Sequence, residues 1–323
     1  MQWTMYPEIL SELLLVEDKM KKCVASRNRL LSNIVNDLLQ SGGKRLRPAF
    51  VILSSKFGEC DSNKVLPLAG AMEILHMATL VHDDIIDRSK IRRGKVTVSE
   101  KYGVDMAVYV GDFLLTKAIL LLSNDVSSEN LENIASSVKT ICEGEVDQYQ
   151  GKNNVDTSIF TYLKRINRKT AVLFAASCGV GAYAARCHEK TRKSLMRYGL
   201  SFGSAFQIRD DLNDYLSNQS NSGKPVIKDI IEGIITLPVI YAMKRNKAIQ
   251  SALADFLGRN DQSTTDELPE LVQMVIGSGG VGDAENLLRR YINRGIEALK
   301  PLPDSIYKRI LIELIMELDI QHK

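Results

Sequence analysis

Residues 65–88 read VLPLAGAMEILHMATLVHDDIIDR and contain a long, clear helical pattern. Apolar side chains recur along the stretch with the spacing of a helix, which opens near Pro67. The stretch ends on the triplet Asp83, Asp84 and Asp87. Positions i and i+4 of a helix lie on one face, about 6 Å apart along the axis, so Asp83 and Asp87 should project together. We therefore expect a long helix that carries a pair of carboxylates at its C-terminal end.

A second acidic cluster repeats this spacing later in the chain. Asp210, Asp211 and Asp214 form the same D-D-apolar-x-D pattern near the end of another helical stretch. Carboxylates at the C-terminus of a helix repel one another and oppose the helix dipole, so a cation should compensate them. Mg²⁺ combines one or two carboxylates with phosphate oxygens and water. One acidic triplet alone is more often a solvated helix end, but two copies indicate a diphosphate held from both sides through Mg²⁺.

Helical spacing also dominates the rest of the chain. Pro48 should be the first residue of an early helix, and further helices are expected over residues 102–123, 129–149, 158–185, 189–216 and 237–257. Alternating β-branched runs are scarce, and no linker rich in Pro, Gly or Ser divides the chain. The sequence predicts an all-α protein with a single domain over residues 1–323.

The composition narrows the class of protein. With 42 basic and 39 acidic residues the net charge is only +3, which gives no sign of nucleic-acid binding. Five cysteines without a C-x-x-C pair are typical of reduced thiols in a cytoplasmic protein. The first residues lack the basic and apolar regions of a signal peptide, and the apolar stretch 170–186 is short for a membrane span. We expect a soluble, cytoplasmic protein that could still contact a membrane surface.

Basic residues lie close to both acidic clusters. One pair flanks the start of a helix, where backbone N–H groups favour anions. Two arginines follow the first cluster in a turn, one lysine opens an apolar helix, and another follows the second cluster. These residues are Lys44, Arg47, Arg92, Arg93, Lys169 and Lys224. Each alone could be an ordinary surface charge, but together they indicate two phosphate-bearing ligands, one held through Mg²⁺ and one by direct contacts.

Five motifs carry a resemblance to a known family. They are GGKRLRP (42–48), EILHMATLVHDDIID (73–87), RRG (92–94), KTA (169–171) and FQIRDDLND (206–214). In this order and spacing they resemble the trans-isoprenyl diphosphate synthases, or polyprenyl synthetases, and especially the long-chain members. The resemblance runs from about residue 40 to about residue 245. It implies a bundle of long helices around a deep central cavity, with the two aspartate clusters facing each other at its mouth.

The resemblance also implies roles for individual residues. About three Mg²⁺ ions would bridge Asp83, Asp87 and Asp210 to an allylic diphosphate. Direct contacts with that diphosphate would come from Arg92, Lys169, Thr170, Gln207 and Lys224. Isopentenyl diphosphate would be held by Gly43, Lys44, Arg47, His76 and Arg93, although a lone His in an apolar helix is more often an ordinary core residue. The implied catalytic residues are Asp83, Asp84, Asp87, Asp210, Asp211, Asp214, Lys169 and Arg92.

The implied reaction condenses isopentenyl diphosphate with an allylic diphosphate through an allylic carbocation. In the family, bulky aromatic residues four or five positions before the first cluster stop chain growth early. Here these positions hold the small residues Thr79 and Ala78, with Leu75 and Met72 further down the same helix. A long all-trans product of about C30 to C50, made from farnesyl or geranylgeranyl diphosphate, is expected unless a neighbouring helix blocks the tunnel.

The sequence departs from the family pattern at one position after the second cluster. The family usually shows G-K-x-T-L-P there, whereas this chain has Ile234 at the lysine position, and Lys228 is the candidate replacement.

Other functions agree less well with the two clusters. A terpene cyclase would carry a different second metal motif, and a non-catalytic regulatory subunit would usually lack one aspartate cluster. A short-chain synthase of about C15 to C20 is the alternative within the family. The resemblance favours a homodimer and leaves a small regulatory subunit open.

Overall fold

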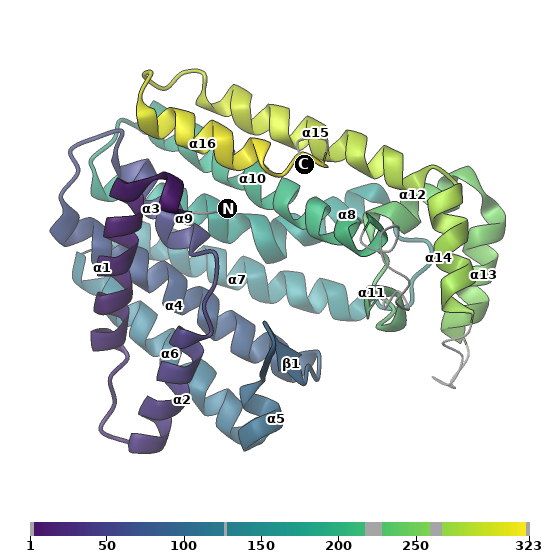
Figure 1. Cartoon of the computed structure of the whole chain (residues 1–323), viewed down its shortest axis with the longest axis horizontal. Helices are drawn as coiled ribbons and strands as arrows, with labels where there is room; N and C mark the ends of the chain where they lie inside the picture. Colours follow the sequence, from purple (N-terminus) through teal and green to yellow (C-terminus); the bar gives the residue numbers. More distant parts are fainter. Residues whose placement is uncertain (1–2, 126–127, 217–227, 259–266, 321–323) are drawn as a thin grey trace. The chain divides into compact units, whose positions relative to one another are not determined.

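The computed structural model describes residues 3–125, 128–216, 228–258 and 267–320. Nearly all the regular structure in these residues is helical, which confirms the predicted all-α class (Figure 1). The chain forms two compact units, and the predicted single domain stays a prediction. The first unit comprises Met1–Ala135, Ala176–Met196 and Pro301–Pro303, and the second comprises Ser136–Ala175, Arg197–Lys300 and Asp304–Lys323. Three helices have residues in both units: α7 (Ser128–Gln150), α9 (Val172–Ala184) and α10 (Glu189–Leu216).

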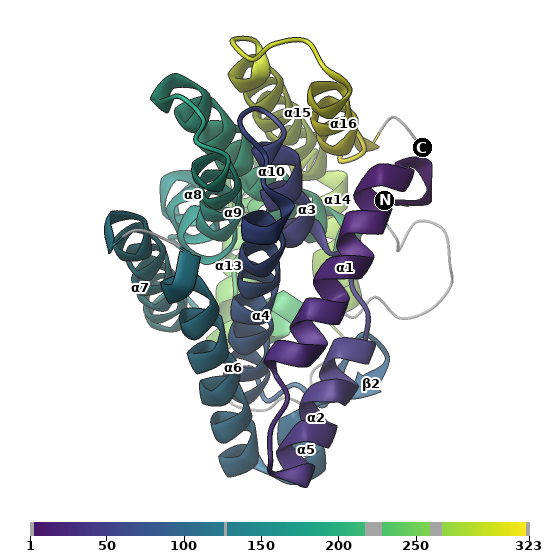
Figure 2. The same cartoon turned by 90° about the vertical axis from the view of Figure 1, so that its left-hand side faces the viewer.

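The first unit is built around the helix α4 (Ser62–Ile86), which packs against α1, α3, α5 and α6 (Figure 2). The other elements that lie wholly in this unit are η1 (Trp3–Met5), α1 (Pro7–Cys23), α2 (Arg29–Gln40), α3 (Leu46–Ser55), β1 (Ile91–Arg92), β2 (Lys95–Val96), α5 (Val98–Tyr102) and α6 (Val104–Asp125). By length and composition both α4 and α6 could cross a membrane, but 72% of the apolar window of α4 is buried within the protein. The corresponding window of α6 is only 33% buried.

The helix α4 begins ahead of Pro67, so the expectation that it opens near this proline is wrong. The side chain of Asp61 accepts a hydrogen bond from the backbone N–H of Asn63 at 3.0 Å and caps the helix there. Leu68 and Met72 are fully buried within α4, and a helix with apolar residues on all sides belongs in a core. Burial on this scale contributes about 1.5–3 kcal/mol for each large apolar side chain.

One buried charge interrupts the apolar surface of α4. The Glu73 side chain is 4% exposed and accepts a hydrogen bond from Arg45 Nη1 at 3.1 Å. The same guanidinium donates to Glu17 of α1 at 2.9 Å and to the backbone carbonyl of Leu39 in α2 at 2.8 Å. Arg45 is also the residue that caps α3. A single guanidinium therefore ties together the first four helices of the unit.

We expect Arg45→Ala to lower the free energy of unfolding by roughly 3–5 kcal/mol, because Glu73 would keep a buried charge without its nearest cation. Urea denaturation followed by circular dichroism measures the change. The double variant Arg45→Ala/Glu73→Ala should recover part of the loss, since it removes both charges. An Arg45→Ala protein with the denaturation midpoint of the unmodified chain would contradict this view of the ion pair.

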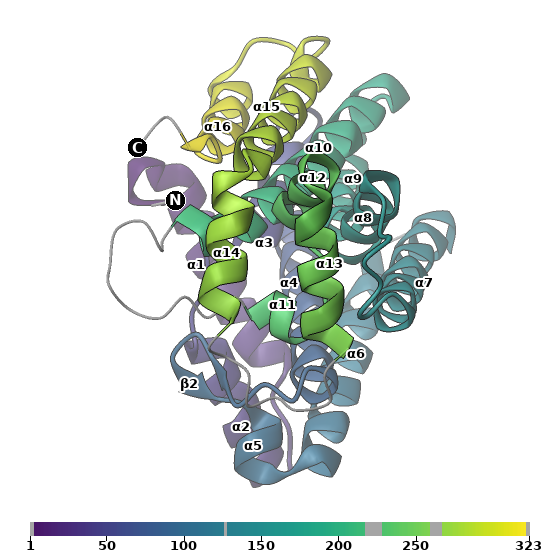
Figure 3. The same ribbon diagram turned by 90° about the vertical axis from the view of Figure 1, so that its right-hand side faces the viewer.

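The second unit contains the shorter C-terminal helices. Its elements are α8 (Ile159–Ile166), the single π turn η2 (Asn167–Ala171), α11 (Lys228–Ile231), α12 (Leu237–Arg245), α13 (Lys247–Gly258), α14 (Leu268–Gly277), α15 (Gly280–Leu299) and α16 (Ile306–Met316). The helix α12 packs against α13, α14 and α15 (Figure 3). Phe174 and Phe202 meet edge to face in the core, with 5.2 Å between their ring centroids.

Some predicted helix boundaries are wrong. The stretch 102–123 divides at Gly103, whose positive φ of 89° ends α5 before α6 begins. The stretch 237–257 divides at Asn246, whose side chain accepts a hydrogen bond from the backbone N–H of Ala248 and starts α13. Pro48 is the third residue of α3 rather than the first. The stretch 158–185 is interrupted by the π turn.

Candidate active site

The first aspartate cluster lies at the C-terminal end of α4, where the sequence placed it. Asp83 is half-buried on the last turn, and Asp87 is the capping residue, whose backbone N–H donates to the carbonyl of Asp83 at 2.8 Å. Asp84 is only 6% exposed and accepts a hydrogen bond from Arg92 Nε at 2.6 Å. The middle carboxylate is therefore paired with an arginine. Asp83 and Asp87 are the residues of the cluster that lie one turn apart and can share a cation.

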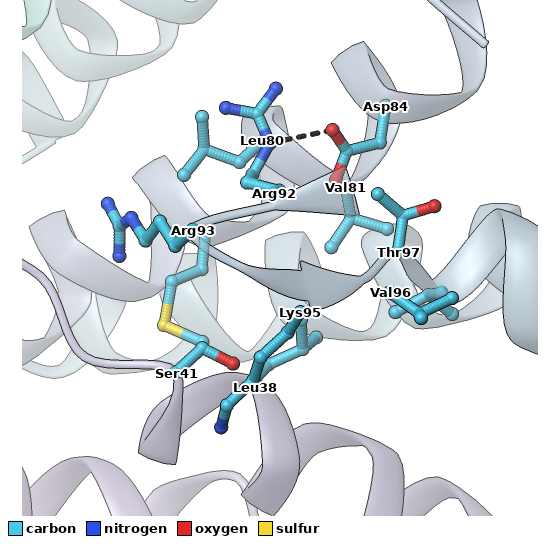
Figure 4. A pocket seen from close by; sticks show the side chains of 12 residues that line it. Leu38, Ser41, Leu80, Val81, Asp84, Arg92, Arg93, Lys95, Val96 and Thr97 are labelled. Atoms are coloured by element: carbon cyan, nitrogen blue, oxygen red, sulfur yellow. Dashed lines mark hydrogen bonds and ion pairs between the residues drawn. The ribbon is translucent and has the colours of Figure 1, made fainter. Parts of the chain in front are cut away.

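Arg92 and Arg93 lie on a short antiparallel hairpin that follows α4 and joins β1 to β2. Arg93 and Gly94 form its turn with φ values of 52° and 74°, and positive φ at both central positions is typical of a tight hairpin. The hairpin closes one side of a cavity of about 60 Å³ within the first unit (Figure 4). Residues in its lining include Leu38, Ser41, Asp84, Arg92 and Arg93.

The structure places Gly43 directly against Arg93. The guanidinium of Arg93 donates to the backbone carbonyl of Gly42. A Cβ atom at Gly43 would lie 2.6 Å from Arg93 Nη1, so only glycine leaves the guanidinium in this position. Lys44 is exposed beside them. Three of the residues predicted to hold isopentenyl diphosphate are thus neighbours in the first unit.

His76 lies among cations of the same unit. Burial, together with the positive charges of Arg47, Arg93 and Arg92, holds the pKa of His76 well below its usual range, so the imidazole is neutral at pH 7. Burial also lowers the pKa of Arg47 to about 10, which leaves that guanidinium charged at neutral pH. Several positive charges in a partly buried place attract an anion such as a diphosphate.

The second aspartate cluster lies near the end of α10, within the second unit, and repeats the arrangement of the first. Asp210 is exposed and Asp214 is half-buried, whereas Asp211 is 6% exposed. Burial and the nearby charge of Asp229 raise the pKa of Asp211 to about 7 and that of Asp214 to about 6. Asp211 accepts hydrogen bonds from the hydroxyl of Tyr162 at 2.7 Å and from Gln207 Nε2 at 2.9 Å. In both clusters the middle aspartate is buried and held by polar side chains.

The π turn carries Lys169 and Thr170 towards α10. Lys169 Nζ lies 2.9 Å from a carboxylate oxygen of Glu145 in α7, and the Thr170 hydroxyl donates to Gln207 at 2.8 Å. Gly203 of α10 permits this approach, because a Cβ atom there would lie 2.5 Å from the Cα of Ala171. Single π turns are frequent at functional sites. Three of the predicted allylic diphosphate residues are therefore connected within the second unit.

The model of the polyprenyl synthetase family matches residues 28–275 of this chain. The chain belongs to the polyprenyl synthetase family. It is accordingly a prenyltransferase, as the sequence predicted. Two curated relatives are heptaprenyl diphosphate synthase component 2 of Bacillus subtilis, 35% identical over 92% of this chain and 84% of the relative, and the short chain isoprenyl diphosphate synthase of Methanocaldococcus jannaschii, 36% identical over 80% of each chain.

Solved structures of polyprenyl synthetases share the fold. The crystal structure of heptaprenyl diphosphate synthase from Staphylococcus aureus has a TM-score of 0.90 and 36% identity, and covers 96% of this chain and 98% of its own. That of polyprenyl synthase from Caulobacter crescentus, complexed with calcium and isoprenyl diphosphate, has a TM-score of 0.88 and 32% identity, and covers 95% and 94% of the two chains. The predicted isoprenoid synthase fold is confirmed.

The carboxylates of this polyprenyl synthetase fit a divalent ion that is shared with a diphosphate. In the described ranges of the chain, no three His, Cys, Asp or Glu side chains form a metal site by themselves. Mg²⁺ needs only one or two carboxylates when phosphate oxygens and water complete its coordination. Asp83 and Asp87 offer such a pair, and Asp210 offers a single exposed carboxylate. Polyprenyl synthetases generally depend on Mg²⁺.

The residues predicted to set chain length all lie on α4. Each residue turns a helix by about 100°, so Thr79 lies about 40° around the axis from Asp83 and Ala78 about 140°. Thr79 is half-exposed, and its hydroxyl donates to the backbone carbonyl of His76 at 2.8 Å. Ala78, Leu75 and Met72 are buried. Thr79 therefore shares the helix face of Asp83 and His76, and Ala78 does not.

Ile234 stands where the family usually has a lysine, and the structure describes its surroundings. Ile234 is 8% exposed, and its backbone N–H donates to the carbonyl of Asp229 at 2.8 Å. Arg165 lies beside this segment and donates to the carbonyl of Ile235 at 2.8 Å. Lys224 lies outside the described residues, and Lys228 is the first residue of α11.

Sequence reasoning missed Tyr162, Arg45 and Glu145, which hold Asp211, Glu73 and Lys169 respectively. One signal was present for Arg45. Glu73 stands in an apolar helix, and a buried carboxylate needs a cation. The other two pairs join residues distant in sequence, and no local pattern identifies them.

Proposed function

We propose that this polyprenyl synthetase condenses isopentenyl diphosphate with farnesyl or geranylgeranyl diphosphate to a long all-trans polyprenyl diphosphate of about C30 to C50. The observation that carries the proposal is the common form of the two clusters. In each, the middle aspartate is buried and hydrogen-bonded, while the first aspartate lies on a more exposed part of its helix. We also propose that the clusters bind the allylic diphosphate from both sides through about three Mg²⁺ ions.

The reaction begins with cleavage of the bond between C1 of the primer and its diphosphate oxygen. Bound Mg²⁺ would act as a Lewis acid on the leaving diphosphate. The ammonium group of Lys169 and the guanidinium of Arg92 stabilise the negative charge that develops on the leaving group, and Lys224 is proposed to join them. The hydrogen bond from Thr170 to Gln207 anchors the π turn that carries Lys169 to α10, and Glu145 lies 2.9 Å from the Lys169 ammonium group.

The second substrate is proposed to bind at the cations of the first unit. Gly43, Lys44, Arg47, His76 and Arg93 would hold isopentenyl diphosphate by its diphosphate. The double bond of this substrate attacks C1 of the allylic cation and forms the new carbon–carbon bond. A proton then leaves the adjacent carbon for the departing diphosphate, so the chain gains five carbons and a trans double bond. No nucleophilic side chain is required.

A long product is supported by the small residues on α4. Thr79 shares the face of Asp83, so a growing tail that passes along this face meets no aromatic ring at that position. The named relatives span both outcomes, since one is a heptaprenyl synthase component and another a short chain synthase.

We further propose a cytoplasmic homodimer. The apolar side chains of Val108, Tyr109, Ile119 and Leu120 are exposed on α6, and a second copy of the chain would cover them. The name of the Bacillus subtilis relative, component 2, supports a requirement for a second, different subunit as the alternative. Release of a long apolar product would bring the enzyme into contact with a membrane surface.

The activity itself is tested with the purified chain, labelled isopentenyl diphosphate and farnesyl diphosphate. Label should enter organic-extractable product with Mg²⁺, and EDTA should abolish incorporation because the acidic clusters would lose their cations. Incorporation that needs an added second protein would identify a heteromeric enzyme. Equal incorporation in Mg²⁺ and EDTA would contradict the proposed role of the clusters.

A further inference from the structure

A buried line of hydrogen bonds lies behind the second aspartate cluster. Tyr162 of α8 is fully buried, and its hydroxyl donates to Asp211 Oδ2 at 2.7 Å. Gln207 Nε2 donates to Asp211 Oδ1 at 2.9 Å, and the Thr170 hydroxyl donates to Gln207 Oε1 at 2.8 Å. Both carboxylate oxygens of Asp211 thus accept a hydrogen bond from a side chain. The line joins α8, α10 and the π turn within one unit.

The ionised form of Asp211 fixes the direction of these hydrogen bonds. That form only accepts, so the phenol of Tyr162 donates, and the amide of Gln207 turns its NH₂ group to Asp211 and its oxygen to Thr170. Burial and the charge of Asp211 raise the pKa of Tyr162 well above its usual value, which keeps the phenol protonated. The guanidinium of Arg165 lies over the Tyr162 ring, 5.5 Å from its centroid. The phenol thus interacts with Asp211 through its hydroxyl and with Arg165 through its ring.

The position of Asp211 decides how its neighbours are presented. Asp210 and Asp211 lie about 100° apart around α10, so holding Asp211 in the core turns Asp210 outwards. This matches the burial, since Asp210 is exposed and Asp211 is not. Lys169 directly precedes Thr170, at the other end of the same line of hydrogen bonds. One phenol can thus set the placement of a carboxylate and of an ammonium group together.

We propose that Tyr162 is a positioning residue for the allylic diphosphate and its metal ions. It holds Asp211 in the core, so that Asp210 is presented for metal binding and, through Gln207 and Thr170, Lys169 is presented to the diphosphate. This rests on the proposed binding of the allylic substrate at the second cluster. Side chains that orient metal ligands commonly contribute 10–100-fold to metal affinity or activity.

A purely structural role is the alternative, and the chain offers a matched control. Tyr198 of α10 is also fully buried, and its hydroxyl donates to the backbone carbonyl of Leu311 at 2.7 Å. Tyr162→Phe and Tyr198→Phe each remove one hydroxyl and one buried hydrogen bond of the same length. Their melting temperatures should fall by similar amounts, whereas only Tyr162 is connected to the second cluster.

The decisive measurement is calorimetric binding of farnesyl thiodiphosphate, a slowly reacting allylic analogue, with Mg²⁺. We expect Tyr162→Phe to weaken this binding roughly 10–100-fold and Tyr198→Phe to bind like the unmodified chain. Steady-state kinetics should show a matching loss in kcat/KM for the allylic substrate and an unchanged KM for isopentenyl diphosphate. Equal binding by the two variants would overturn the proposal. If the unmodified chain binds no analogue, the proposed function itself is wrong.

A double-mutant cycle tests whether the effect passes through Gln207. Thr170→Val removes the far end of the line of hydrogen bonds and keeps the shape of the side chain. If Tyr162 acts on Lys169 through this line, the losses of affinity for the analogue in Tyr162→Phe and Thr170→Val should be less than additive in the double variant, while the part of the effect that passes through Asp210 is retained. Strictly additive losses would contradict the transmission from Tyr162 to Lys169.

Discussion

Asp83→Asn is expected to lower kcat for isopentenyl transfer by roughly a hundredfold to a thousandfold. Asp83 and Asp87 lie one turn apart at the end of α4, where the helix dipole already disfavours negative charge. A divalent ion offsets that repulsion, and an amide in place of one carboxylate removes half of the pair. The loss should fall on the ionisation of the allylic diphosphate. Incorporation of labelled isopentenyl diphosphate at saturating substrates measures it.

A matched variant controls for the loss of one carboxylate from the first unit. Asp112 of α6 lies 3.4 Å from His82, and its side chain is largely exposed. Asp112→Asn should keep the kcat of the unmodified chain. Both variants should unfold at similar temperatures, so that a difference in rate reports on catalysis rather than on folding. An Asp83→Asn enzyme with full activity would contradict the proposed metal site on α4.

Thr79→Phe is expected to shorten the main product from C30 or longer to about C15–C20. Thr79 lies about 40° around α4 from Asp83, on the face where the growing tail would descend. A phenyl ring there would close this path after at most one addition of five carbons to farnesyl diphosphate. The overall rate of the first condensation should change little, because the ring lies one turn below the carboxylates. Chromatography of the dephosphorylated products measures the chain length.

Two further variants test whether product length depends on the face of α4 that carries Asp83. Ala78 lies about 140° from Asp83 and is buried, so Ala78→Phe should shorten the product less and destabilise the protein more through overpacking. Thr116 of α6 is exposed and also donates to a carbonyl of its own helix, so Thr116→Phe should leave the product length unchanged. A Thr79→Phe enzyme that still makes a C30 product would place the tunnel elsewhere.

Features with local spacing were predictable from the sequence. The spacing of the D-D-x-x-D pattern predicted which carboxylates share a helix face, because the helical period alone decides this. The end of each apolar helical pattern placed both clusters near helix ends. The GGKRLRP and RRG motifs likewise identified Arg93 and Gly43, which the structure brings into direct contact. The helix breaks at Gly103 and Asn246 were missed, although glycine and asparagine are the residue types that favour such breaks.

Long-range partners were not predictable in the same way. Tyr162 and Asp211 lie 49 residues apart in sequence, and Arg45 and Glu73 lie 28 apart. Their pairing depends on which helices pack together, and the periodicity of one helix carries no information on that. The middle aspartates appeared equivalent to their neighbours in the sequence. The structure distinguishes them, because each is buried and its hydrogen-bond donor comes from another element.

The most direct single measurement is the length of the product made by the unmodified chain. Purified protein would be incubated with Mg²⁺, labelled isopentenyl diphosphate and farnesyl diphosphate, and the dephosphorylated products resolved by chain length. An all-trans ladder that ends at C30 or beyond is the predicted result, since Thr79 leaves the face below Asp83 without an aromatic block. A ladder that stops at C20 would contradict a long-chain synthase while keeping the reaction.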